Sequence, residues 1–283
     1  MYMREYFCGQ YFKCQSDAKS LAVIPAMHVN NGQKSCSIQL ITGSGAWNAD
    51  FPCWAMEKNG ETLTVGESSF SKSGARICVK TPELRAEGEL FWGRLAPPKY
   101  DIMGPFCCVP FMECRHSVYS MKHSVNGKVI VNGEEFVFED GTGYIEGDRG
   151  RSFPKKYLWT QYCFDRGSIM LSAADIPLLG RSFTGVIGFV LLDGKEYRIA
   201  TYLGARLLKL CSREISVLQG DRYLAVKMPE TAPGELRAPC RGKMSRTIRE
   251  NLSCSVYYCF RKGGETLFEA QAQNASFEYE YPR

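Results

Sequence analysis

The sequence lacks several features that would assign the protein to a familiar class. No apolar run of about 18 residues occurs, so we expect no transmembrane segment. Residues 1–15 contain no apolar core of the kind found in secretory signal peptides, so we do not expect secretion through a cleaved signal. No G-x-S-x-G sequence is present to indicate a nucleophilic serine. Gly141 and Gly143 are not part of a G-x-G-x-x-G pattern, which argues against a dinucleotide site.

The cysteines indicate the compartment. There are 13 of them in 283 residues, an odd number without a repeating framework, and Cys107 and Cys108 are adjacent in an apolar segment. In a chain of this size such thiols are typical of a reducing environment, so we expect a cytoplasmic protein. The net charge of +5 is evenly mixed and does not indicate nucleic acid as a partner.

Strand signals occur along the whole chain. Short runs of β-branched and aromatic residues are separated by Asn-Gly, Asp-Gly and Gly-Gly pairs, which are typical of hairpin turns. The runs are 35–41, 76–79, 117–123, 128–131, 134–138, 185–192, 197–202 and 255–260, and the turns include Asn126-Gly127, Asn132-Gly133 and Asp193-Gly194. Only 243–252 has a helical period. This pattern predicts an all-β fold of antiparallel barrels or sandwiches.

The chain also repeats itself. Residues 11–15 and 22–25 are echoed by 157–161 and 174–177, and each half later contains a glutamate, Glu113 or Glu250, that precedes a Ser-Val-Tyr sequence and a turn. The repeat favours two related lipocalin-like or calycin-like β-modules from an internal duplication. We place the division after residue 140, with modules at 1–140 and 141–283.

The stretch 141–161 is unusual for a strand. It contains Gly141, Gly143, Gly147 and Gly150, together with Pro154, which cannot donate to a strand ladder. We interpret it as a loop with a special backbone conformation that opens the second module and leads into a strand at 157–164. An equally weighted alternative is a structural plug, in which Asp148 pairs with a neighbouring arginine.

Three titratable residues lie among hydrophobic ones and are candidates for chemistry. They are Glu113, His116 and Asp175. Burial raises a carboxyl pKa, so such a group can remain protonated at neutral pH and act as a general acid. The alternative is a buried carboxylate satisfied by arginine or backbone N–H groups. Cys114, His116 and His123 are zinc-ligand types, but their spacing matches no compact zinc motif, so we predict no metal site.

Several ordered motifs resemble those of the tocopherol cyclase family, most closely its bacterial branch. The central one, at 143–161, is similar to the family pattern G-Y-x-E-x-x-W-G-x-S-F-P-x-x-W-x-W-x-Q. Further matching segments are 102–123, 168–177, 196–205 and 236–251. The resemblance implies a calycin-like architecture of two β-modules, related to that of lipocalin-like carotenoid hydratases.

The resemblance also implies a reaction that needs no cofactor. Tocopherol cyclases, which are isomerases, protonate a prenyl double bond and let a phenol oxygen capture the cation. By this likeness the acid is Asp148, Glu146 or Asp175, with Asp148 preferred. Tyr144 and Trp159 would face the cation, while Gln161, His116 and Arg151 would orient the head group or tune the acid. Glu113 is a further candidate for substrate binding.

The chain departs from the family pattern at several points. Arg149 stands where the family has Trp, Gly147 where Lys is common, and Tyr157 where Trp is usual. These changes make the site smaller or more polar, which weakens the expectation of a long prenyl-quinol substrate. We therefore weigh a cyclase or hydratase, slightly favoured, against a lipocalin-like carrier of a hydrophobic small molecule. Peripheral contact with a membrane is left open.

Overall fold

The computed structural model describes residues 5–16, 19–110, 112–178, 181–228 and 234–281. The protein is all-β, with 74% of the described residues in strands and large antiparallel sheets, as the sequence predicts. The chain divides into two compact units. The first comprises Met1–Lys99, Cys114–Phe153 and Leu236–Thr247, and the second comprises Tyr100–Glu113, Pro154–Glu235 and Ile248–Arg283.

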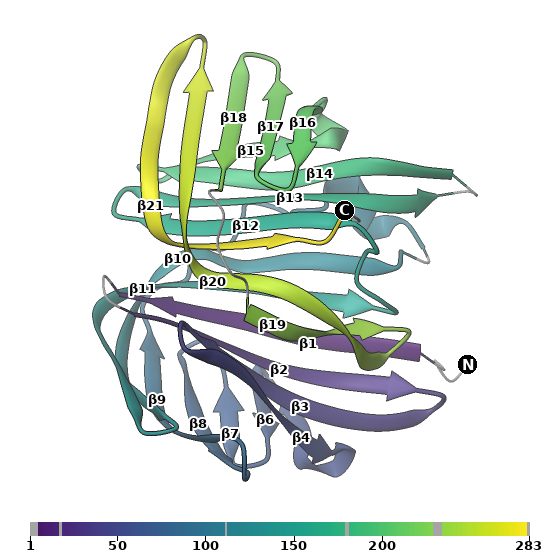
Figure 1. Ribbon diagram of the computed structural model, residues 1–283, viewed down its shortest axis with the longest axis vertical. Coiled ribbons are helices and arrows are strands. Elements are labelled where there is room, and N and C mark those ends of the chain that lie inside the picture. The colour runs from purple at the N-terminus through teal and green to yellow at the C-terminus, as the bar shows by residue number, and fades with distance from the viewer. Residues whose placement is uncertain (1–4, 17–18, 111, 179–180, 229–233, 282–283) are drawn as a thin grey trace. The chain divides into compact units, whose positions relative to one another are not determined.

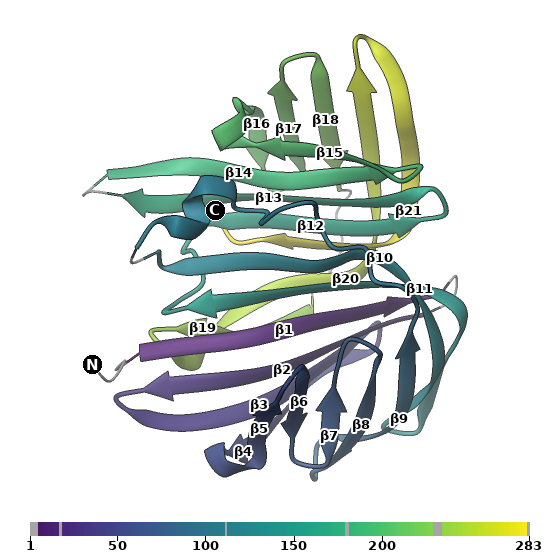
Figure 2. The same ribbon diagram turned by 180° about the vertical axis from the view of Figure 1, so that it is seen from behind.

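The sheet of the first unit has 11 strands in the order β4-β3-β2-β1-β11-β10-β9-β8-β7-β6-β5 (Figures 1 and 2). Neighbouring strands are antiparallel, and the last strand of the set, β11, returns to pair with the first. The strands and the short helix η1 are β1 Glu5–Gln15, β2 Ser20–Asn30, β3 Gln33–Thr42, β4 Gly45–Pro52, η1 Cys53–Ala55, β5 Met56–Asn59, β6 Thr62–Val65, β7 Ser68–Phe70, β8 Gly74–Lys80, β9 Arg85–Trp92, β10 Cys114–Val131 and β11 Glu134–Gly150.

One face of this sheet encloses a hydrophobic core. Strands from both ends of the sheet order contribute buried side chains to the same cluster, including Ala49 of β4 and Val65 of β6. Phe12 of β1 stacks on Phe70 and Trp92 within it. A sheet whose two ends share one core must curl strongly, which agrees with the lipocalin-like prediction.

The second sheet has 10 strands, with the order β15-β14-β13-β12-β21-β20-β18-β17-β16 and β19 paired to β20. Its own core contains Leu158, Val190, Val226 and Phe260. The elements are η2 Gly104–Cys108, β12 Tyr157–Phe164, β13 Gly167–Leu178, β14 Arg181–Leu192, β15 Lys195–Ala200, η3 Thr201–Leu203, β16 Arg206–Cys211, β17 Glu214–Gln219, β18 Arg222–Lys227, β19 Gly234–Cys240, β20 Lys243–Lys262 and β21 Glu265–Tyr279.

The two sheets repeat one connectivity. Each begins with consecutive antiparallel strands, β1 to β4 or β12 to β15, and its last strand pairs with its first. The sequence echo of 11–15 and 157–161 falls on these first strands, β1 and β12. The second echo, of 22–25 by 174–177, is displaced by two residues in the pairing. Lys13 pairs with Ala22, but Trp159, which corresponds to Lys13, pairs with Ser172 and not with Ala174, which corresponds to Ala22. A shift of two keeps every side chain on its face of the sheet.

Three local expectations are wrong. Residues 141–150 are not a loop but the second half of β11, so the division that we place after residue 140 lies inside a strand of the first unit. The segment 243–252, with its helical period, is the beginning of β20. Asn126-Gly127 is not a turn but lies within β10, at a bulge. The strand expected at 157–164 is confirmed as β12.

The glycines of β11 serve close approach between strands. A Cβ atom on Gly147 would lie 2.7 Å from the carbonyl oxygen of Gly9 on β1. A Cβ on Gly143 would lie 2.3 Å from Nε2 of His123 on β10. The positive φ angles needed for turns occur elsewhere, for example at both residues of Asn132-Gly133. Within the described residues, no helix is long and apolar enough to cross a membrane.

This packing predicts that Gly147→Ala destabilises the protein. The added methyl group meets backbone that cannot move away cheaply, so we expect the free energy of unfolding to fall by about 1–3 kcal/mol in urea titrations. Gly43→Ala is the matched control, because nothing lies within 4 Å of its Cβ position, and it should change stability by less than about 0.5 kcal/mol. Equal stability of the two variants would contradict the close approach of β1 and β11.

Candidate functional site

The candidate site lies on the face of the first sheet opposite its hydrophobic core. Along β11, Tyr144, Glu146 and Asp148 alternate with core residues such as Ile145, so their three side chains share one face. The register places His116 of β10 directly opposite Asp148. Residues opposite each other in an antiparallel pair also share a face, so the pairing adds His116 to this row.

The imidazole of His116 lies between two carboxyl groups. Its Nδ1 atom is 3.1 Å from Oδ1 of Asp148, and its Nε2 atom is 3.3 Å from Oε2 of Glu146. Little of these side chains reaches solvent: 12% of His116 and 8% of Glu146 is exposed, against 21% of Asp148. Buried charges of opposite sign at these distances stabilise one another strongly because little water screens them.

The contacts continue beyond the histidine in both directions. The hydroxyl of Tyr144, which is fully buried, donates a hydrogen bond of 2.5 Å to Oε2 of Glu146. At the other end, the thiol of Cys114 donates to Oδ1 of Asp148 over 3.4 Å. Tyr144, Glu146, His116, Asp148 and Cys114 therefore form a continuous chain of polar contacts, which we call the β10–β11 relay. Exposure rises along it from Tyr144 to Asp148.

The environment holds a proton on His116. Burial alone lowers the pKa of His116, but the charges of Glu146 and Asp148 and the hydrogen bonds to both outweigh it, so the pKa lies well above the usual 6.5. The unfolded pKa is lower, so this contribution to stability is complete below about pH 6.5. It is lost as the pH rises through the folded-state pKa. The site thus stores a proton at neutral pH.

The same three residues are also a set that could hold a cation. The ligand atoms of His116, Glu146 and Asp148 lie within 4.8 Å of one another. A metal-bound histidine offers the lone pair of one ring nitrogen to the ion. Here both ring nitrogens face carboxylate oxygens, an arrangement typical of a protonated imidazole. His123, the other zinc-type residue considered, lies against Trp92 of the core instead.

The remaining predicted residues lie elsewhere. Arg151 follows β11 and is exposed, and its carbonyl oxygen accepts a hydrogen bond from the backbone N–H of Gly242. Trp159 and Gln161 are buried on one face of β12 in the second unit, where the Gln161 amide donates to the Cys163 sulfur over 3.1 Å.

The second unit also contains the last two candidates. Asp175 of β13 accepts a hydrogen bond of 2.8 Å from the Thr184 hydroxyl, and its other oxygen is 4.0 Å from Nζ of Lys156. Its side chain is 27% exposed. Glu113 is half-buried immediately before β10. The structure thus brings Tyr144, Glu146, Asp148 and His116 together, and assigns Trp159, Gln161, Asp175 and Glu113 to a different unit.

The sequence analysis did not predict two buried polar features of the sheets. Lys13 of β1 lies directly opposite Tyr144 and is only 1% exposed, an unusual position for lysine. The sequence feature that could have indicated this burial is the position of Lys13 within the otherwise apolar run YFKC. In the second unit the Tyr157 hydroxyl donates to Glu278 over 2.6 Å, and both residues are buried. Glu278 and Glu280 alternate with aromatic residues near the C-terminus, and this pattern could have drawn attention to Glu278.

Comparison with known proteins gives similarity at the level of the fold. No protein-family model and no curated sequence matches the chain. Among solved structures, CghA with Sch210972 superposes with a TM-score of 0.63 at 9% identity, covering 98% of this chain and 89% of CghA. Kievitone hydratase from Nectria haematococca has a TM-score of 0.57 at 9% identity, with coverage of 97% and 89%.

A third structure agrees with these two. A protein from Nitrosomonas europaea provisionally assigned as AttH has a TM-score of 0.55 at 10% identity, covering 99% of this chain and 93% of its own. Nearly the whole chain therefore has the fold of these lipocalin-like proteins. At such low identities the likeness concerns the fold and leaves the site to be judged from its own geometry.

The protonation of His116 can be tested by NMR on the wild-type protein. Burial lowers the pKa of both His28 and His123 to about 4, so these two rings should be neutral at pH 7, whereas His116 should be an imidazolium. Long-range ¹H–¹⁵N spectra of the imidazoles distinguish the two forms. Glu146→Gln should lower the His116 pKa, and Glu139→Gln, at an exposed position on the same strand, should not. A His116 ring that is neutral at pH 6 would contradict the charge pairing.

Proposed function

We propose that the protein is an acid–base catalyst that adds an oxygen nucleophile to a carbon–carbon double bond of a hydrophobic small molecule. The observation that carries this proposal is the His116 imidazole buried between Glu146 and Asp148, with Tyr144 bonded to Glu146. Such a cluster can give one proton and take another in the same turnover.

The reaction is balanced without a redox partner. The π electrons of the double bond take up a proton supplied by His116 through Glu146, and a C–H bond forms. The oxygen nucleophile then bonds to the carbon left electron-deficient, and its own proton returns to the carboxylate side of the relay. A phenol oxygen of the same molecule gives cyclisation, whereas water gives hydration.

Two likenesses support this reaction class. The sequence motifs resemble those of tocopherol cyclases, and one structural neighbour is by name a kievitone hydratase. Another neighbour, CghA, has been crystallised with the small molecule Sch210972. We therefore propose prenylated quinols and related isoprenoids as the substrate class, with Glu146 and His116 as the central proton-transfer residues. Asp148, the first choice from the sequence, becomes the more exposed end of the relay.

The protonation state narrows the substrate. A raised pKa makes the imidazolium a weak acid, and weak acids protonate isolated alkenes poorly. Within the proposed class of prenylated quinols and isoprenoids, the site therefore suits members whose double bond is conjugated to a carbonyl or aryl group better than members whose double bond is isolated. It also follows that turnover should fall as the pH rises through the His116 pKa, because the proton donor is then lost.

The test is turnover of a panel of prenylated phenols and conjugated enones, guided by mass spectrometry of any lipophile that co-purifies. On a substrate established with wild type, Glu146→Gln should lower kcat by about 10²–10⁴-fold while ligand binding persists, because proton transfer is lost. Glu139→Gln is the exposed control on the same strand and should retain full activity. Unchanged kcat in Glu146→Gln would refute the role of the relay, and binding without turnover in wild type would identify a carrier.

A further inference from the structure

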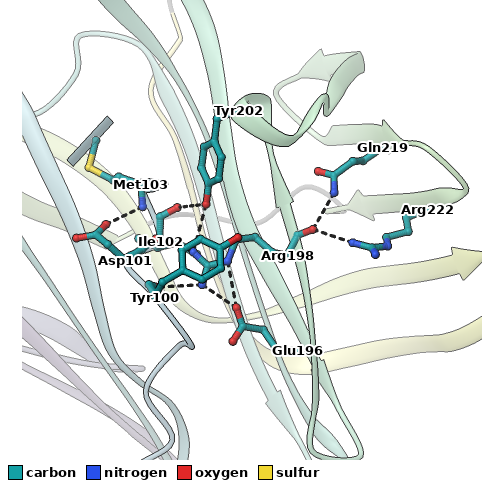
Figure 3. Close-up of polar contacts among 9 residues, drawn as sticks. All are labelled: Tyr100, Asp101, Ile102, Met103, Glu196, Arg198, Tyr202, Gln219 and Arg222. Atoms are coloured by element: carbon teal, nitrogen blue, oxygen red, sulfur yellow. Dashed lines mark hydrogen bonds and ion pairs between the residues drawn. The ribbon is translucent and has the colours of Figure 1, made fainter. Parts of the chain in front are cut away.

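A strongly anchored segment of the second unit precedes β10. Arg198 of β15 donates hydrogen bonds to the carbonyl oxygens of Tyr100 and Asp101, at 2.9 and 2.7 Å (Figure 3). Its guanidinium also lies 3.8 Å from the centre of the Tyr100 ring and forms an ion pair of 2.7 Å with Glu196. Because Arg198 and Glu196 are both buried, this clamp is far stronger than a surface contact.

The clamp fixes the chain that follows it. The Tyr202 hydroxyl bonds to Arg198 and donates to the carbonyl oxygen of Ile102 over 3.1 Å. Two backbone turns then form the beginning of η2. The N–H of Gly104 donates to the carbonyl oxygen of Asp101 over 3.0 Å, and the N–H of Phe106 donates to that of Met103 over 3.1 Å. The Phe106 ring packs 6.3 Å from the Tyr202 ring and 6.2 Å from that of Phe183. Residues 100–106 are therefore held at both ends.

Two cysteines end this anchored segment. The Sγ atoms of Cys107 and Cys108 are 3.6 Å apart, and neither cysteine is in a disulfide. Cys108 is exposed and Cys107 partly exposed, so reagents in solution can reach them. Two thiolates bound to one tetrahedral centre at about 2.3 Å each are about 3.8 Å apart, close to the distance already present here.

We propose that Cys107 and Cys108 form a bidentate thiol site for soft, thiophilic centres such as trivalent arsenic. The hydrogen-bonded turns and the Arg198 clamp hold the two sulfurs at chelating distance, so binding costs little ordering entropy. With an arsenoxide, both S–H bonds break, two S–As bonds form, and the oxygen leaves with the two protons as water. Arsenic stays trivalent and no oxidant is consumed. The site is independent of the β10–β11 relay and of the reaction proposed for it.

Phenylarsine oxide is the probe, applied to the folded wild-type protein and followed by intact mass spectrometry. We expect one phenylarsenic group per chain that survives excess monothiol and is removed by a dithiol such as ethanedithiol. Cys107→Ser and Cys108→Ser should each weaken this binding at least about a hundredfold, because one thiolate cannot chelate. Cys240→Ser is the control, since Cys240 is exposed and its sequence neighbours are Pro239 and Arg241, and it should bind like wild type.

A second arm tests the contribution of the fold. The same measurement is made on the protein unfolded in urea, where Cys107 and Cys108 are still adjacent in sequence but the Arg198 clamp is lost. We expect the affinity for phenylarsine oxide to fall about tenfold or more. Equal affinity in urea would show that the fold does not prepare the pair and would overturn the proposal. So would a monothiol-resistant adduct that persists in Cys108→Ser, or the failure of folded wild type to form one.

Discussion

Burial of charge on one face of the first sheet is the constraint on which the rest of its architecture depends. An unpaired buried charge costs several kcal/mol, so Glu146, Asp148 and His116 can be buried only together. Their meeting requires the register that pairs His116 with Asp148 and Val118 with Glu146. A slip of one residue would turn Glu146 toward Phe12 and Phe138 of the core. The charges therefore fix the alignment of β10 and β11.

One strand, β10, supplies two histidines to two environments, because His123 lies an odd number of positions after His116. The register shifts between Val118 and Ser120 and again between Ser120 and His123. Before the shifts, His116 faces the carboxylates; after them, His123 lies edge-on to Trp92 in the core, with Nδ1 bonded to the Ser120 hydroxyl at 3.0 Å. The two one-residue shifts add up to two residues, so they leave His123 on the face that alternation assigns to it. The opposite pKa shifts of the two rings follow from these environments rather than from their neighbours in sequence.

The sequence predicted what depends on local pattern and failed where distant strands decide. The motif at 143–161 named Tyr144, Glu146 and Asp148 as candidates, although that stretch was interpreted as a loop, and Asn132-Gly133 and Asp193-Gly194 do lie at hairpin turns. In 243–252, Met244, Ile248 and Leu252 recur every four residues, which fits a helix but also fits one face of a strand. Pairing with β19, and with β21 from Glu250 onward, decides for the strand. The glycines at 143 and 147 suggested a loop because their real partners, His123 and Gly9, are distant in sequence. Asp175 is a further example: its apolar neighbours in sequence suggested that its carboxyl group is buried, whereas 27% of its side chain is exposed.

The two sheets share one connectivity, but the polar groups buried in them differ. Both bury a tyrosine hydroxyl against a glutamate: Tyr144 with Glu146 in the first unit, and Tyr157 with Glu278 in the second. All three histidines of the chain, His28, His116 and His123, lie in the first unit. The first of these pairs is joined to a histidine, His116, on which the charges of Glu146 and Asp148 hold a proton at neutral pH by raising its pKa. The Tyr144–Glu146 pair is thus one end of the β10–β11 relay, because β10 places His116 beside it.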